Sequence, residues 1–238
     1  MADEKIGYQT SLQLAVIPLI LYGIFSGDAW WLLLSIPMFY FFRYIGITIF
    51  YHRMMSHGVG ISDIHPITKF ILTTIAFYGS ISTPMQMAAV HLQHHKYPDT
   101  EKDPHSPTLL GKNVLFTNRW KPVLDRAAIV SYSKDPMYEF FRLNFKKLFW
   151  IAFIILFIVN YKILIFGWLI PAGLTIWSIG YGVYVSHKQN CPVESVGWFK
   201  DIFLCAGDCF KHESHHKNPS ASSGEGFISY TISLLRKL

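Results

Sequence analysis

The sequence predicts an all-helical integral membrane protein, with four transmembrane helices in two hairpins, an interfacial helix and a cytoplasmic cap rich in histidine. Three observations predict this fold class. The 238 residues are 51% hydrophobic and only 15% charged, whereas charged residues make up about 25% of ordinary soluble domains. The apolar residues come in blocks close to the length that crosses a bilayer. Most of the 11 histidines gather in short polar stretches outside these blocks. We interpret residues 1–238 as one membrane domain.

Residues 11–25 and 29–50 form the first predicted hairpin. A helix needs about 20 apolar residues to cross a hydrocarbon core about 30 Å thick, and both blocks approach that length. The N-terminal residues lack the small-residue cleavage site of a signal peptide, so the first helix is expected to remain in the mature protein. Arg43 lies inside the second block, where a charge is costly unless it pairs or faces the protein interior. The sequence does not identify its partner.

Residues 67–90 form the predicted interfacial segment. Its uninterrupted apolar run is short, and Gly79 and Pro84 interrupt it. Runs of that length are more often buried or interfacial than spanning. An interfacial position also keeps the histidines before and after this segment on one side of the membrane.

Residues 148–166 and 167–185 form the second predicted hairpin, and residues 91–147 and 186–238 are the predicted cytoplasmic segments. In this arrangement every Lys and Arg except Arg43 and Lys162 lies on the histidine-bearing side. The excess of positive charge on one side indicates the cytoplasm. The sequence therefore predicts a multi-pass protein with its active site on the cytoplasmic face.

The histidines form three clusters, YHRMMSH, HLQHH and HESHH. The last two share the spacing H-x-x-H-H, which on a regular helix places three imidazoles within an arc of about 100°. Rings that share one face can converge on a metal ion. His52 and His57 are five residues apart, which separates them by about 140° on a regular helix. That pair indicates either two ions or a distorted helix end.

The clusters are also expected at one depth, just below the cytoplasmic leaflet. His187 immediately follows the fourth predicted span and joins the candidates for that reason, whereas His65 precedes a proline and is predicted to be solvated. Asp103 and His105 in KDPHSP fit two interpretations, groups that orient the ligating histidines or a solvated turn. The predicted metal ligands are His52, His57, His91, His94, His95, His187, His212, His215 and His216.

This number of imidazoles indicates two metal ions. Zinc sites use three or four protein ligands, so a single ion could not bind all of these histidines. Imidazole suits zinc, copper, iron and nickel. Two redox-active irons beside a membrane point to dioxygen chemistry on a lipid-like substrate.

These motifs resemble the histidine boxes of the membrane fatty acid desaturases, specifically the acyl-CoA (stearoyl-CoA-like) delta-9 group. The matching stretches are ITIFYHRMMSH, AAVHLQHHKYPDTEKDPHSP and GDCFKHESHH, and His187 falls at the family's isolated ligand. The resemblance covers roughly residues 29–220. The chain departs from the family pattern at Val183, where the acyl-CoA enzymes often have asparagine, and at residues 84–87, where a tryptophan-rich run is usual.

The resemblance implies an O2-dependent, non-haem di-iron oxidoreductase. It would introduce a cis double bond at the delta-9 position of a saturated acyl chain, with two iron ions as cofactor and O2 as co-substrate. An external donor such as a ferredoxin or a cytochrome would supply two electrons. The expected partners are a fatty acyl chain on coenzyme A, acyl carrier protein or lipid, together with this donor and membrane lipids. Nucleic acid is not an expected partner.

Three alternatives remain at this stage. A di-iron hydroxylase, ketolase or alkane monooxygenase would use the same site and return oxygen to the substrate. HESHH also satisfies H-E-x-x-H, in which His212 and His216 would bind zinc with Glu213 as general base of a membrane metalloprotease. A protein that buffers metal or senses pH would use the histidines without catalysis.

Overall fold

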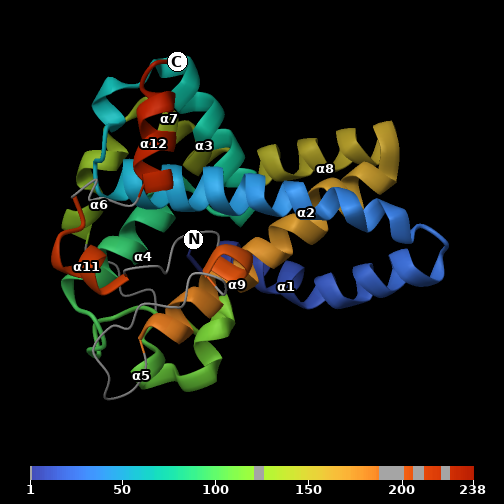
Figure 1. Cartoon of the computed structure of the whole chain (residues 1–238), viewed down its shortest axis with the longest axis horizontal. Helices are drawn as coiled ribbons and strands as arrows, with labels where there is room; N and C mark the ends of the chain where they lie inside the picture. Colours follow the sequence, from blue (N-terminus) through green and yellow to red (C-terminus); the bar gives the residue numbers. More distant parts are fainter. Residues whose placement is uncertain (1, 121–125, 188–200, 206–211, 221–225) are drawn as a thin grey trace.

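The computed structural model describes residues 2–120, 126–187, 201–205, 212–220 and 226–238. Within these residues every regular element is helical. Long helices run side by side and a cap of shorter helices covers one end of them (Figure 1). Three apolar helical segments are long enough to cross a membrane, which agrees with a helical membrane protein.

The first hairpin consists of α1 (Ala2–Phe25) and a continuous run of three elements, η1 (Ala29–Trp31), α2 (Leu32–Tyr40) and η2 (Phe41–Ser56). Gly27 makes the turn with φ +80°, a conformation that glycine adopts readily. The apolar helix continues to Ser56, beyond the predicted end at residue 50. Its last part, η2, is a π-helix that contains His52 and ends directly before His57.

The second hairpin consists of α8 (Phe145–Lys162), η6 (Ile163–Leu169) and α9 (Ile170–Ser186). This apolar segment of 42 residues reverses direction at Asn160, whose φ of −168° and ψ of 111° are not helical. The reversal brings the rings of Phe149 and Trp168 to 5.4 Å. The predicted boundary between residues 166 and 167 is therefore wrong. Asn160 breaks the helix because its Oδ1 accepts a hydrogen bond from the Lys162 backbone N–H.

An ion pair joins the tips of the two hairpins. Lys162 Nζ lies 2.5 Å from Asp28 Oδ1. Both turns are consequently at the same end of the bundle, opposite the cap (Figure 1).

The predicted interfacial segment is two helices, α3 (Pro66–Ser80) and α4 (Pro84–Lys96). They are separated at Ile81, which has a left-handed φ of 50°. The Thr83 hydroxyl caps α4 by accepting a hydrogen bond from the Gln86 N–H. One predicted element is thus corrected to two, and only α4 carries histidines of the site.

The remaining described elements are short and belong mainly to the cap. Their bounds are η3 (Ile61–Asp63), α5 (Pro107–Leu110), η4 (Gly111–Leu115), η5 (Thr117–Arg119), α6 (Arg126–Ser133), α7 (Pro136–Leu143), η7 (Asp201–Cys205), α11 (His212–Lys217) and α12 (Gly226–Leu235). Of these elements, η3, α6, α7 and α12 contribute to a buried core that includes Ile47, Phe50 and Met54 of η2, whereas η4 and η7 pack against α9 and η5 packs against α1.

Arg43 is 1% exposed and finds polar partners on two elements. Its Nε donates to Ser178 Oγ on α9 at 2.9 Å, and its Nη1 donates to Thr48 Oγ1 at 2.9 Å. A buried guanidinium requires hydrogen-bond partners because it has lost its contact with water. By bonding to Ser178, Arg43 links the second apolar segment to the last one.

Candidate metal centre

The π-helical backbone of η2 brings His52 and His57 together. Hydrogen bonds from residue i to i+5 place residues five apart nearly one above the other. The two rings are 5.2 Å apart, although a regular helix would separate them by about 140°. Of the two alternatives that the sequence left open, the distorted helix end is the one that the structure contains.

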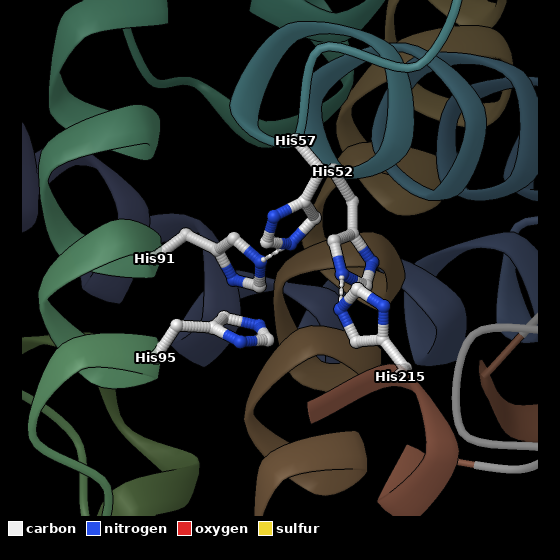
Figure 2. Close-up of side chains that lie close together, drawn as sticks. All are labelled: His52, His57, His91, His95 and His215. Atoms are coloured by element: carbon white, nitrogen blue, oxygen red, sulfur yellow. Dashed lines mark hydrogen bonds between the residues drawn. The ribbon is translucent and has the colours of Figure 1, made fainter. Parts of the chain in front are cut away.

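Five histidines from three elements form the first group (Figure 2), which we call the five-histidine group. Each offers one ring nitrogen, and these nitrogens lie within 4.8 Å of one another. Within the group, Nε2 of His52 is 2.6 Å from Nε2 of His215, and Nε2 of His57 is 2.7 Å from Nε2 of His91. The group comprises His52 of η2, His57 directly after η2, His91 and His95 of α4, and His215 of α11.

Three further histidines form a second group, the three-histidine group. His94, His187 and His216 also bring ring nitrogens within 4.8 Å of one another. Nε2 of His94 and Nε2 of His187 are 3.1 Å apart. The two groups adjoin, since the rings of His95 and His216 stack at 4.2 Å.

Each H-x-x-H-H cluster contributes to both groups, which corrects the expectation that its three rings converge together. In α4, His91 and His95 join one group and His94 the other. The boundary between the groups falls within the arc of the cluster, because residues i+3 and i+4 diverge to opposite sides of residue i. The side chains of His212 and Glu213 lie outside the described residues, so the predicted roles of both remain predictions.

Two aspartates hold the outer nitrogens of the three-histidine group. Nδ1 of His94 donates to Asp103 Oδ2 at 2.9 Å, and Nδ1 of His187 donates to Asp99 Oδ2 at 3.1 Å. A carboxylate can only accept when ionised, so each Nδ1 carries hydrogen and each Nε2 lone pair is available to a cation. This contact, together with the burial of Asp103, which is 2% exposed, favours the orienting role over the solvated turn.

The loop between α4 and α5 holds both aspartates in place. The backbone N–H groups of Asp99 and His105 donate to the two oxygens of Asp103, and the Ser106 hydroxyl donates to Asp99 Oδ1. His105 itself lies with its ring 4.5 Å from that of His94. His94, Asp103 and His105 also form a compact set of potential ligand atoms. The sequence reasoning missed Asp99, although it stands in the same polar stretch as Asp103.

The five-histidine group has a cation as its outer contact. Nη1 of Arg53 is 2.9 Å from Nδ1 of His215, and Arg53 is 3% exposed. A guanidinium only donates, so Nδ1 of His215 accepts. In a neutral ring the hydrogen is then on Nε2, the atom that faces His52, so a metal ion can bind this nitrogen only after that hydrogen leaves. The sequence reasoning also missed Arg53, whose only signal is its place between the two histidines of HRMMSH.

Burial favours the neutral form of several histidines of the site. It lowers the pKa of His91 and of His94 well below the ordinary value, and neighbouring histidines lower both further. The same two causes, burial first, lower the pKa of His216 to about 3. Burial raises the pKa of Asp103 to about 6, against backbone hydrogen bonds from His105 and Asp99 that lower it. Neutral imidazoles crowded in a buried site are a donor set that fits metal cations.

The comparisons with known proteins point to lipid desaturases. No family model matches the chain. It is 34% identical over 107 residues to icosanoyl-CoA 5-desaturase of Limnanthes douglasii, which covers 41% of the chain. It is 25% identical over 161 residues to Delta-9 acyl-lipid desaturase 1 of Arabidopsis thaliana, which covers 64% of the chain. It is 32% identical over 77 residues to hex-5-enoyl-(acyl-carrier protein) acetylenase of Moorena producens (strain JHB), which covers 32% of the chain.

The chain spans less than half the length of each of these three relatives, with matches over 28%, 48% and 23% of their sequences. Two of them are desaturases by name, one acting on an acyl-CoA and one on an acyl lipid. The similarities support the fatty acid desaturase family and, with it, an oxidoreductase of lipid metabolism. They do not favour the metalloprotease alternative.

Proposed function

We propose that the protein is a membrane-bound fatty acyl desaturase that holds two iron ions and introduces a cis double bond, at the delta-9 position, into a saturated acyl chain. The reaction would consume one O2, two electrons and two protons for each double bond and release two waters. The observation that carries the proposal is the pair of adjoining, largely buried histidine groups, assembled from α4, α11 and the C-terminal ends of η2 and α9.

The two histidine groups would each hold one ion. The five-histidine group offers five ring nitrogens and the three-histidine group three, and His212 is proposed as the ninth ligand. Bound there, the irons would supply O2 activation and the removal of hydrogen from two adjacent methylenes. The protein's own contribution is orientation. Asp99 and Asp103 fix the rings of His187 and His94, and burial of the groups excludes water from the reaction.

A small cavity of about 50 Å³ lies beside the histidines. Its walls include His52, His91 and His94 together with apolar side chains. A second cavity reaches toward Gln9 and Gln86. The two cavities share four wall residues, Met87, Val90, Trp120 and Ile179. We propose that the acyl chain occupies this path, with the reacting methylenes next to the histidines.

The helical arrangement supports four membrane crossings with the cap in the cytoplasm. The reversal at Asn160 divides the apolar segment Phe145–Ser186 into two passes, and both hairpin tips lie at the end of the bundle opposite the cap. The external partners are a soluble electron donor, such as a ferredoxin or a cytochrome, and an acyl chain. The relatives' names cover coenzyme A, lipid and acyl carrier protein, so the proposal includes all three carriers.

The test is the fatty acid profile of a desaturase-deficient host that expresses the chain. The wild type should produce monounsaturated chains, and His94→Ala should abolish them because it removes a ring from the three-histidine group. His65→Ala is the matched control, since His65 is exposed at the start of α3 and outside both groups. Purified protein should hold two irons per chain.

Three outcomes would contradict the proposal. Hydroxylated chains without new double bonds would indicate the hydroxylase alternative. One zinc and no iron would indicate the metalloprotease. Full desaturation by His94→Ala would remove the metal site from the reaction.

A further inference from the structure

The surface of α12 divides into three faces. One face is buried, with Ile228 8% exposed and Ile232 4% exposed. A second face is apolar and open, with Phe227 70%, Tyr230 58% and Leu234 43% exposed. At about 100° per residue these three side chains fall on one stripe. The remaining face presents polar groups that include the exposed Ser233. The helix therefore has one face packed on the protein, one open apolar face and one polar face.

Both ends of α12 are fixed to the first hairpin and its continuation. The Phe227 ring stacks on that of Tyr44 at 5.3 Å, and the Tyr44 hydroxyl is 3.0 Å from Thr231 Oγ1. Tyr44 belongs to the apolar segment Ala29–Ser56. At the other end, Arg236 forms an ion pair with Asp63 of η3 at 2.5 Å. In Figure 1, α12 lies crosswise to the run of α2 and η2.

An apolar groove of about 470 Å³ adjoins the open face of α12. The groove continues onto the outer surface of the second apolar segment, where Leu33, Ile36 and Phe41 are 61%, 58% and 42% exposed. Its lining residues are Pro37, Tyr40, Phe41, Tyr44, Ile45, Ile202 and Phe227.

We propose that α12 and this groove form a lipid-binding surface at the inner edge of the bilayer. Phe227, Tyr230 and Leu234 would lie among acyl chains, and one phospholipid chain would occupy the groove. Continuity with the lipid-facing side of a spanning segment identifies lipid as the occupant. The three-faced pattern is that of a helix in the interfacial plane. Lys237 adds a positive charge at its end for anionic headgroups.

The surface would also anchor the third histidine cluster. Only residues 218–225 separate α11, which carries His215 and His216, from α12. Attachment of α12 to the leaflet limits how far these two histidines can move away from the membrane. The lipid contact itself stands on the faces of α12 and does not depend on the proposed desaturase chemistry.

Photocrosslinking tests the lipid contact in the full-length protein, reconstituted into vesicles of phosphatidylcholine with phosphatidylglycerol. A benzoylphenylalanine side chain replaces Tyr230 on the open face or Ser233 on the polar face of the same helix. Irradiation should give phospholipid adducts, detected as a mass increase of the protein, several-fold more often at position 230 than at position 233.

Equal lipid adducts at the two positions would overturn the proposal. A crosslink from position 230 to a second protein chain would do the same, because it would identify the face as a protein interface. Both variants should elute like the wild type in size-exclusion chromatography, which shows that the label leaves the fold intact. The readout is independent of desaturation, so the two proposals can fail separately.

Discussion

Asp103 contacts the ring of His94 at Nδ1, whereas Nε2 of the same ring is the nitrogen near His187. Its own two oxygens are held by backbone N–H groups of the same loop. The carboxylate can therefore fix the orientation of the ring and raise the electron density of a ligating nitrogen. Carboxylates that hydrogen-bond to a ligating histidine typically raise metal affinity by about 10- to 100-fold.

Asp103→Asn should therefore lower metal affinity by roughly 10- to 100-fold. The amide is close in size but provides a neutral oxygen in place of the charged acceptor. Metal retained by the purified protein during dialysis against a graded series of chelator concentrations measures the effect. Glu101→Gln is the matched control, because it makes the same chemical change at an exposed position two residues away. Unchanged metal retention in Asp103→Asn would contradict the orienting role.

At the residue scale, the sequence predicted the histidines better than their neighbours. Histidines at helical spacing in polar stretches serve no packing purpose and therefore indicate ligands, and eight of the nine predicted ligands lie in the two groups. Asp99 and Arg53 gave no comparable signal. Their roles depend on the path of a loop and on the approach of α11 to η2, and residue spacing within one segment reports neither.

The close packing of α3 on η2 depends on Gly46. A Cβ at this position would lie 3.0 Å from the Cα of Ala76 and 3.2 Å from its backbone nitrogen. The backbone of α3 cannot move away as a flexible side chain could. Since η2 also carries His52, the distance between these two helices affects the position of a histidine of the site.

Gly46→Ala should lower the free energy of unfolding by about 1–3 kcal/mol, the usual effect of overpacking, and should reduce metal content. The midpoint of thermal unfolding in detergent and the iron bound per chain are the measurements. Gly7→Ala serves as control, because a Cβ there would have no neighbour within 4 Å and alanine favours the helix. Equal midpoints for the two variants would show that α3 adjusts without cost.

At the element scale, periodicity failed where the helical geometry changes. The rules for helix faces assume a constant rotation per residue, and η2 departs from it for 16 residues. The pairing of His52 with His57 could therefore be stated only as one of two alternatives. The break at Ile81 was missed for a different reason, since a left-handed isoleucine is rare and the neighbouring Pro84 was taken for an interruption within one segment.

At the scale of the whole molecule, apolar blocks and charge predicted more than local motifs did. Block length predicted helices long enough to span a membrane, and three such segments are present among the described residues. The position of the second reversal was misjudged because the chain is apolar on both sides of it. Asn160 breaks the helix through a single side-chain hydrogen bond. Hydropathy is averaged over a window of many residues and therefore does not detect one polar residue in an apolar run.

The proposed topology places the hairpin tips and the cap on opposite sides of the membrane. Ser26 is exposed in the first hairpin turn, and Ser62 is exposed in η3 beside the cap. In Ser26→Cys the thiol should react with a membrane-impermeant maleimide added to intact cells. In Ser62→Cys it should react only after the membrane is permeabilised. The wild type, whose three cysteines follow the fourth proposed crossing, gives the background on the cytoplasmic side. Labelling of both variants from the same side would mean that the apolar helices do not carry the chain across as proposed.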